Sequence, residues 1–312
     1  MMDAAPYHAD ITDNPNGVCH WLTCIDEVRI RVGHWAADNA KGTILIFPGR
    51  TEYIEKYSRA ATDFTARGYA CVAIDWRGQG IADRLLENRA IGHVDLFEDY
   101  QLDAKAVLSH VKKLGLPEPY FLLGHSMGGC IGLRSLYDGL PVKAVAFSAP
   151  MWGIKMSPAL RPIAWGLSSV SKQLGFSEVF APGQQAETYV LRTNAQDNTL
   201  TSDPNSFDEL QNQLIEHPDL ALGGPSLHWL NESLREMRTL SMRPSPDVPC
   251  MTFLGTEEVI VDSDRIYDRM DRWPNGQLKM VEDGRHEILL ERAPLRERVL
   301  DDMIGLFDNY SA

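Results

Sequence analysis

The chain has 312 residues, of which 44% are hydrophobic and 23% charged, which is ordinary for a soluble globular protein and enough for one large α/β domain with an insertion. Its formal net charge of −13 excludes a general attraction to nucleic acid, although a local basic patch could still bind an anionic group. No stretch approaches the roughly 20 apolar residues of a membrane span, and the N-terminus lacks the basic and apolar regions of a secretion signal.

The first 150 residues alternate between strand-like and helix-like patterns. Residues 18–36 alternate apolar and polar side chains, which predicts two antiparallel strands with a turn near Asp26. Short apolar runs closed by Gly or Pro are typical of buried parallel strands. Such runs predict strands at 43–47, 69–75, 120–124 and 144–150, with helices at about 53–67 and 95–114 among them. This order indicates a mostly parallel sheet with helices on both faces.

The alternation breaks at about residue 151. No clean strand pattern occurs up to about residue 240, and aromatic and Met residues are scattered among helical stretches there. Strands are predicted again at 250–255 and 277–282, followed by a helix at about 288–309. We therefore predict an α/β core formed by residues 1–150 and 241–312, interrupted by a helical insertion over residues 151–240.

The strongest local motif is GHSMGG at 124–129, which matches G-x-S-x-G and lies where a strand gives way to a helix. This context is that of a nucleophile elbow, rather than of a Gly-rich turn with an incidental serine. The turn is tight enough to require Gly124 and Gly128 beside the nucleophile. It places the hydroxyl of Ser126 at a helix N-terminus, where N–H groups and the helix dipole favour developing negative charge.

A serine hydroxyl is a poor nucleophile unless a base accepts its proton. His286 lies between the last predicted strand and the last predicted helix, at the sheet edge where open α/β folds place catalytic groups. We therefore predict that it is the base rather than a surface histidine. His228, in the insertion, is a candidate for lining a substrate pocket, the alternative being a packed or exposed histidine.

The acid that orients the base is predicted to follow the strand at 250–255. Glu258 and Asp262 both lie just past the end of this strand, and Glu257 is a third candidate. Asp262 precedes a predicted helix and has the residue type of an N-cap, which is its alternative role. We therefore favour Glu258.

Acyl transfer also requires donors for the oxyanion. One predicted donor is the N–H of Met127, directly after the nucleophile, and the other is the N–H of Arg50 in the loop after the strand at 43–47. The side chain of Arg50 could be a charge in the pocket or a simple surface residue.

The five cysteines are few and odd in number, which favours a reducing compartment and hence the cytoplasm. Cys71 and Cys250 lie in apolar runs, so buried free thiols are expected. Cys19 and Cys24 could form half of a metal site, but no second pair or histidine cluster completes it. We predict neither a metal nor an organic cofactor.

Several further segments resemble the monoacylglycerol lipase and lysophospholipase branch of the α/β-hydrolases, and the resemblance runs over most of the chain. It rests on FPGRTEYIEKY (47–57), IDWRGQG (74–80), GHVDLFEDY (92–100), GHSMGG (124–129), LGGPSLHWLNES (222–233), EEVIVD (257–262) and GRHEILLE (284–291). The LGGPSLHW stretch is much more specific than the elbow.

The resemblance implies an α/β-hydrolase fold with Ser126 as nucleophile, His286 as base and Glu258 as acid. The wider family usually has Asp at the acid position and His-Gly in the oxyanion loop, where this chain has Glu258 and Pro-Gly. The lysophospholipase-like subgroup looks similar in both respects. The family's insertion is a cap that shapes an acyl-chain pocket, and Trp229 is the candidate lining residue there, or else an anchor of the cap.

These observations predict a serine hydrolase that cleaves a carboxylic ester of a monoacyl lipid through an acyl-enzyme. Transient contact of the cap with a membrane surface fits such a substrate. The alternatives are a peptidase or amidase, a hydrolase of small esters, and a ligand-binding protein without catalysis. A carboxylate nucleophile, as in dehalogenases and epoxide hydrolases, is disfavoured because a serine occupies that position.

Overall fold

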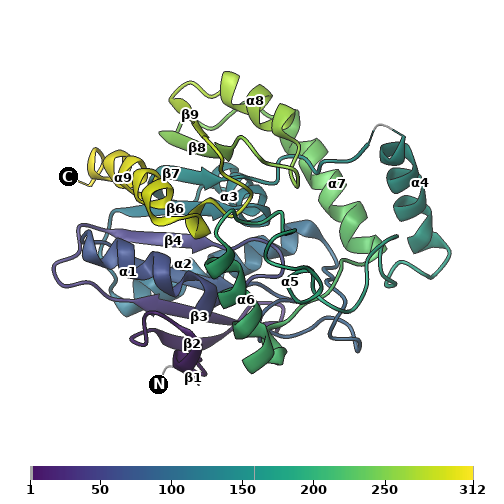
Figure 1. Ribbon diagram of the computed structural model, residues 1–312, viewed down its shortest axis with the longest axis horizontal. Helices are drawn as coiled ribbons and strands as arrows, with labels where there is room; N and C mark the ends of the chain where they lie inside the picture. Colours follow the sequence, from purple (N-terminus) through teal and green to yellow (C-terminus); the bar gives the residue numbers. More distant parts are fainter. Residues whose placement is uncertain (1–2, 158, 312) are drawn as a thin grey trace.

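A nine-stranded sheet forms the centre of the molecule (Figure 1). The computed structural model describes residues 3–157 and 159–311. The strands are β1 (Asp3–Ala5), β2 (Val18–Thr23), β3 (Arg29–Trp35), β4 (Thr43–Phe47), β5 (Ala70–Asp75), β6 (Tyr120–His125), β7 (Val142–Ser148), β8 (Cys250–Gly255) and β9 (Gly276–Val281). Their order across the sheet is β1-β2-β3-β5-β4-β6-β7-β8-β9. β1, β2, β3 and β5 pair antiparallel, and the pairs from β5 to β9 are parallel.

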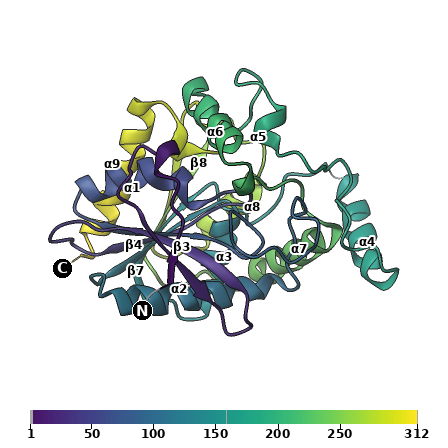
Figure 2. The ribbon, with the colours of Figure 1, turned by 90° about the horizontal axis from the view of Figure 1, so that it is seen from below.

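Helices cover both faces of this sheet, as predicted. They are α1 (Ser58–Ala66), α2 (Tyr100–Leu114), α3 (Met127–Tyr137), α4 (Leu160–Gln173), α5 (Tyr189–Arg192), α6 (Pro204–Glu216), α7 (Leu227–Ser241), α8 (Ser263–Asp271) and α9 (Ala293–Asp308). Phe64 of α1 and Phe307 of α9 belong to the hydrophobic cluster on one face. Val107 of α2, Leu133 of α3 and Ile266 of α8 belong to the cluster on the other (Figure 2).

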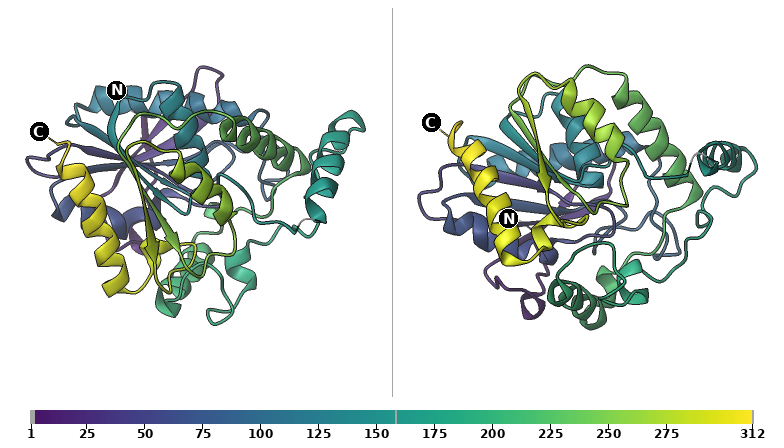
Figure 3. Two further views of the ribbon diagram at one scale, coloured as in Figure 1. Left: turned by 90° about the horizontal axis from the view of Figure 1, so that it is seen from above. Right: turned by 45° about the horizontal axis from the view of Figure 1, so that its top comes forward.

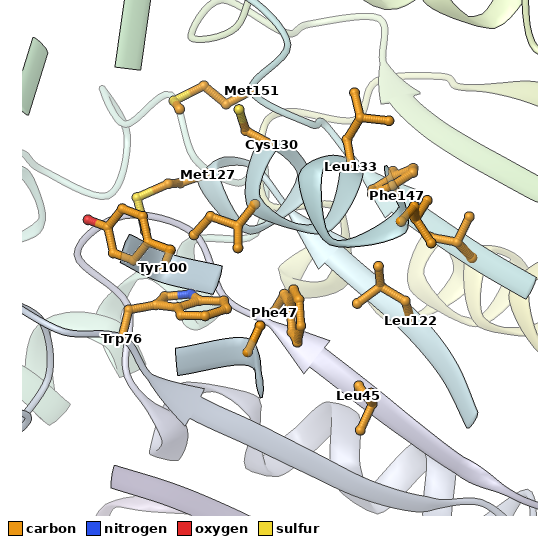
Figure 4. Packing of buried hydrophobic residues seen from close by; sticks show 14 of the residues in the cluster. Leu45, Phe47, Trp76, Tyr100, Leu122, Met127, Cys130, Leu133, Phe147 and Met151 are labelled. Atoms are coloured by element: carbon orange, nitrogen blue, oxygen red, sulfur yellow. The ribbon is translucent and has the colours of Figure 1, made fainter. Parts of the chain in front are cut away.

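The buried core extends from the central strands to the motif at 124–129. Figure 4 shows its labelled members, Leu45, Phe47, Trp76, Tyr100, Leu122, Met127, Cys130, Leu133, Phe147 and Met151. The rings of Phe47 and Trp76 meet edge to face at 5.0 Å, and Trp76 contacts Tyr100 in the same manner at 5.8 Å. Met127 is fully buried in this cluster, so the residue after the serine is fixed by packing.

The predicted strands occur where the apolar runs are, with small shifts at their ends. The predicted strands at 43–47 and 250–255 are β4 and β8 with those bounds. The strand predicted at 144–150 is β7, which ends at Ser148 because Ala149 has a positive φ of 41° and Pro150 has no N–H to donate. β1 was not predicted, since three residues are too few for a periodic pattern.

The helices of the predicted insertion, α4 to α7, lie beyond the ends toward which the parallel strands point (Figures 1 and 3). α4 packs on α7. α7 in turn belongs to the main core through Trp229, Met237 and Leu240. The last helix of this segment is therefore part of the same hydrophobic cluster as the sheet domain.

All five cysteines are free and buried, as predicted for Cys71 and Cys250. Cys19 and Cys24 pack in separate hydrophobic clusters, so they do not form half of a shared metal site. Among the described residues, no helix is both long enough and apolar enough to cross a membrane.

Candidate active site

Ser126 occupies a strained turn between β6 and α3. Its φ is +48° and its ψ is −115°, a conformation that a residue with a side chain rarely adopts. The surrounding backbone holds it there. The Ser126 N–H donates to the carbonyl of Ser148 over 3.0 Å, and the Ser126 carbonyl accepts from the N–H of Met151 over 2.8 Å and of Gly129 over 2.9 Å. Such strain persists only where neighbouring structure imposes it, which is typical of functional sites.

The glycines around Ser126 are required by close backbone contacts. A Cβ on Gly128 would lie 1.9 Å from the carbonyl oxygen of Phe47 at the end of β4. A Cβ on Gly124 would lie 3.0 Å from the carbonyl oxygen of Gly128. The turn and the loop after β4 are therefore in direct backbone contact.

Three of the predicted residues form a hydrogen-bonded chain. Nε2 of His286 lies 3.0 Å from Oγ of Ser126, and Nδ1 of His286 lies 2.7 Å from Oε2 of Glu258. Because a carboxylate accepts from Nδ1, Nε2 is left as an acceptor for the serine hydroxyl. His286 and Glu258 are both buried. This arrangement can transfer a proton from Ser126 to His286.

Glu258 is held in its ionised form by donors from two sides. Its Oε1 accepts from the N–H of Ile260 over 2.5 Å and of Val261 over 3.0 Å. Burial raises the pKa of Glu258, but the hydrogen bond and charge of His286 together with these two N–H groups outweigh it, so the pKa lies below its usual value.

The other two acid candidates lie elsewhere. Glu257 is exposed, and its backbone N–H donates to the carbonyl of Gly284. Asp262 is at the N-cap position of α8, but its carboxylate forms an ion pair with Arg161 at 2.9 Å instead of capping the helix. The expectation that its side chain caps α8 is therefore wrong, since Arg161 takes up the carboxylate.

The two predicted oxyanion donors come from adjacent segments. Met127 is the first residue of α3, so its N–H has no acceptor within that helix. Arg50 lies in the loop that Gly128 contacts. Within the part of the chain that the structure describes, the N–H groups of Met127 and Arg50 donate to no other protein group.

This loop is supported by two residues that sequence reasoning did not identify. The indole Nε1 of Trp76 donates to the carbonyl of Pro48 over 3.0 Å. The amide of Gln79 donates to the carbonyl of Gly49 over 3.3 Å and accepts from the N–H of Thr51 over 2.7 Å. Both residues belong to the IDWRGQG segment, so this segment positions the loop that carries Arg50.

A buried charge network lies beside the nucleophile and was also missed. The ammonium of Lys56 pairs with Glu52 and, at 2.7 Å, with Glu287. Nε2 of His125 lies 3.2 Å from Glu287 and 3.5 Å from Glu52, and its ring centroid is 4.9 Å from that of His286. Glu52, His125 and Glu287 have the residue types and spacing of a metal-ligand set. Here the ammonium of Lys56 provides the positive charge that the two carboxylates require.

The network perturbs the pKa values of its members. Burial lowers the pKa of His125, but the charges of Glu287 and Glu52 outweigh it and raise the pKa above its usual value. Burial raises the pKa of Glu287, but the charges of His125 and Lys56 outweigh this effect and hold the pKa well below its usual value. The positively charged form of His125 is therefore favoured next to the catalytic histidine candidate.

A cavity of about 610 Å³ opens over Ser126 and His286. Most of its lining is apolar and comes from residues 151–240, including Met151, Ile154, Ile163, Ala164, Leu167, Leu210, Leu214 and Leu227. Of the described lining residues, Arg50, Glu52, Lys56, Lys155 and Glu287 are charged, and His125, whose charged form is favoured, lines the cavity as well. The site can therefore take a molecule with a long apolar part and a small polar part.

The two predicted pocket residues have different positions. Trp229 lines the cavity, yet it is also 97% buried, and its Nε1 lies 3.2 Å from the hydroxyl of Tyr100. Trp229 therefore both lines the pocket and anchors α7 to the sheet domain. His228 is not among the residues that line the cavity. Its side chain contacts the segment at 93–95 instead, where Nε2 lies 2.7 Å from the carbonyl oxygen of Asp95 and the ring stacks on that of His93. The pocket role of His228 is therefore wrong.

Comparisons with known proteins agree with this architecture. The profile of the family described as "Serine aminopeptidase, S33" matches residues 38–293. Lysophospholipase L2 of Escherichia coli is 28% identical over 304 residues, covering 93% of this chain and 87% of that protein. Phospholipase YtpA of Bacillus subtilis is 26% identical over 289 residues, covering 88% of this chain and 98% of that protein.

Solved structures share the same fold. A soluble variant of monoglyceride lipase from Saccharomyces cerevisiae, solved with a substrate analogue, superposes with a TM-score of 0.73 and 21% identity. The match covers 94% of this chain and 95% of that chain.

The acid can be tested by labelling. A fluorophosphonate reacts with a serine only when a base activates it, so Glu258→Gln should slow labelling of Ser126 on the order of 10⁴-fold. Asp262→Asn is the matched control and should change the rate by less than about tenfold, since Asp262 pairs with Arg161. The labelling rates of the two variants and the wild type are measured by gel fluorescence. If Asp262→Asn abolishes labelling while Glu258→Gln preserves it, the assignment is wrong.

The charge of His125 can be tested through the pH dependence of stability. Its folded pKa lies above the ordinary value of 6.5, so its stabilising effect is fully present below that pH and is lost as the pH rises through the folded pKa. The difference in free energy of unfolding between wild type and His125→Asn should therefore shrink as the pH rises above about 6.5.

His110→Asn provides the opposite control for this measurement. Burial lowers the pKa of His110 to about 4, so the wild type should gain stability over this variant as the pH rises from about 4 to about 6.5, and the difference should stay constant above that pH. Denaturant titrations at each pH give both differences. A His125 difference that grows with pH would contradict the charged state.

Proposed function

The chain belongs to the serine aminopeptidase, S33 family of α/β-hydrolases, and from that premise we propose that it hydrolyses the ester of a monoacyl lipid with Ser126, His286 and Glu258 as its catalytic triad. The observation that carries this proposal is the hydrogen-bonded chain from Glu258 through His286 to Ser126 at the base of an apolar cavity. No step of this reaction requires a metal or an organic cofactor.

The mechanism follows from the positions of the protons. Nε2 of His286 accepts the proton of Ser126 as Oγ attacks the ester carbonyl, and Glu258 stays ionised and stabilises the imidazolium. The N–H groups of Met127 and Arg50 donate to the oxyanion. His286 then gives its proton to the departing alcohol, leaving an acyl-enzyme. Water, deprotonated by the same His286, releases the fatty acid and restores the free Ser126 hydroxyl.

The substrate class is supported by the lining of the cavity and by the names of the relatives. Leu167 of α4, Leu210 of α6 and Leu227 of α7 offer an apolar surface suited to an acyl chain. We propose that residues 151–240 form a cap over the site, between the two parts of the α/β core. Relatives named lysophospholipase, phospholipase and monoglyceride lipase support a monoacyl lipid as substrate.

An aminopeptidase, which the family description names, would need a carboxylate free to bind the amine of its substrate. Of the described residues that line the cavity, the acidic ones are Glu52 and Glu287, and both are paired with Lys56. Their negative charge is also matched by His125. This pairing favours an ester over an N-terminal amine as the group recognised.

The cap also carries apolar side chains on its outer surface. Val170 of α4 and Leu174 at its C-terminal end are 46% and 66% exposed. We propose that this face makes transient contact with a membrane surface from which a lipid substrate is taken. The five free cysteines support a cytoplasmic location.

Replacement of the nucleophile tests the proposed chemistry. Ser126→Ala should lower hydrolysis of a p-nitrophenyl ester by on the order of 10⁴- to 10⁶-fold, because only the attacking oxygen is removed. Its melting temperature and circular dichroism should match those of the wild type. Retention of more than about a tenth of the activity would contradict a serine mechanism.

A series of esters tests the acyl pocket. Each methylene buried in the cavity should contribute about 0.8 kcal/mol, roughly a fourfold gain in kcat/KM, until the cavity is full. Ala164→Phe, which adds a ring to the cavity lining, should shift the plateau to shorter chains. Val170→Phe is the matched control, because Val170 lies on the same helix outside the lining. A wild-type preference for acetate that declines with length would identify a small-ester hydrolase instead.

A further inference from the structure

The side chain of Arg50 lines the cavity and joins the loop that carries the proposed oxyanion donor to residues 222–229. Its Nη1 donates to the carbonyl of Gly223 over 2.9 Å, and its guanidinium lies 5.7 Å from the ring centroid of Trp229. Both partners belong to the LGGPSLHW stretch. This stretch, the most specific of the sequence motifs, therefore holds the side chain of Arg50, which lines the same cavity as Ser126.

The chain packs closely around this guanidinium. A Cβ on Gly92 would lie 3.1 Å from Nη1 of Arg50, and a Cβ on Gly223 would lie 2.4 Å from the carbonyl oxygen of Ala186. The N–H of Gly223 donates to Ala90 and that of Ser226 to Gly92. The segments around 90–92, 184–186 and 222–226 thus form one hydrogen-bonded frame, and the arginine is held in a built site rather than free in solvent.

Arg50 lacks the anion that a charge in such a site requires. Among the described residues, no carboxylate lies within ion-pair distance of it, whereas Arg31 pairs with Glu55 and Asp75 at 2.7 Å. Arg269, also without a carboxylate, is instead bonded to several carbonyl and hydroxyl oxygens, while Arg50 has one such acceptor. Taking a charge out of water without a partner is unfavourable.

The other cations that line the cavity are paired with carboxylates or solvated. His125 lies within ion-pair distance of Glu52 and Glu287. Lys56 is matched by Glu52 and Glu287. Lys155 is exposed, so water solvates its ammonium. Burial, offset only in part by Tyr100, lowers the pKa of Arg50 to about 10, and the guanidinium still stays charged near neutral pH. The cavity therefore presents one oriented, charged fork of N–H donors.

We propose that Arg50 is a phosphate subsite, which gives this enzyme a preference for phosphate-bearing monoacyl lipids over neutral ones. The guanidinium geometry matches two phosphate oxygens at once. Because Arg50 also supplies an oxyanion N–H, its side chain begins beside the reacting carbonyl, and the short glycerol backbone places a phosphate near that ester. The inference rests on the proposed function and narrows its substrate class.

The test compares two substrates with the same acyl chain, lysophosphatidylcholine and 1-monoacylglycerol, each below its critical micelle concentration. The measured quantity is the ratio of kcat/KM for the phospholipid to kcat/KM for the neutral lipid. Arg50→Gln should lower this ratio by about 10- to 100-fold, the loss expected for charge-assisted hydrogen bonds. Arg50→Lys, which keeps a point charge but not the fork, should give an intermediate ratio.

Lys155→Gln is the matched control, because it removes another cation from the cavity lining. Its ratio should stay within about threefold of the wild type, since a solvated charge contributes little. If Lys155→Gln and Arg50→Gln lower the ratio equally, the preference comes from the overall positive charge of the cavity, and the subsite at Arg50 is disproved. An unchanged ratio in Arg50→Gln disproves it as well.

Binding to Ser126→Ala separates this inference from the proposed function and does not depend on the folding of an Arg50 variant. Calorimetry should show that an ether analogue of lysophosphatidylcholine binds more tightly than the matching alkylglycerol. That result would support the subsite even if wild-type protein cleaved neither lipid, an outcome that would overturn the proposed function alone. Inorganic phosphate should compete only weakly. If it binds as tightly as the lipid analogue, the site is one for free phosphate and the proposal fails.

Discussion

The close approach between the turn at Ser126 and the loop after β4 is the constraint on which the rest of the site depends. Gly128 leaves no space for a side chain against the carbonyl of Phe47, so the backbone of α3 and that loop are in contact. This contact brings together the two segments that carry Met127 and Arg50, whose N–H groups are the proposed oxyanion donors. The positive φ of Ser126 then directs its side chain toward His286.

Buried charges keep the loop after β4 in this position. Arg31 on β3 binds Glu55 and Asp75, and Asp75 also accepts from the N–H of Ile54, so the far end of the loop is tied to two strands. Lys56 and Glu52 tie it to Glu287, next to the catalytic histidine candidate. Because each of these charges is buried, removing one partner would leave the other uncompensated, and the loop has little freedom to move.

Much of this arrangement can be predicted from sequence, because the signals are local. Apolar runs closed by Gly or Pro identify β4 and β8, and the G-x-S-x-G context identifies Ser126. The acid cannot be settled in the same way. Glu258 and Asp262 are four residues apart in a loop, and what separates them is the partner each one meets, His286 or Arg161, which the local pattern does not contain.

The errors and omissions have similar physical causes. His228 and Trp229 are neighbours on α7, yet only one faces the cavity, and the rotation of the helix is set by its packing on α3 and α4. Gln79 and His125 act through partners distant in sequence, so the local pattern does not reveal their roles. The same holds for Arg50, whose guanidinium meets a carbonyl 173 residues away.

The proposed cap is joined to the backbone of Ser126 and to backbone segments next to Glu258 and His286. Its first residue, Met151, donates to the carbonyl of Ser126, and Ile154 forms a bridge with Val261, whose N–H binds Glu258. Farther along, the carbonyl of Leu200 accepts from the N–H of Glu287, directly after His286. The cap is therefore not an interchangeable module. Exchanging it as a block for that of a relative would keep the triad aligned only where the new segment restored these backbone contacts, whereas side-chain changes within the existing cap leave them in place.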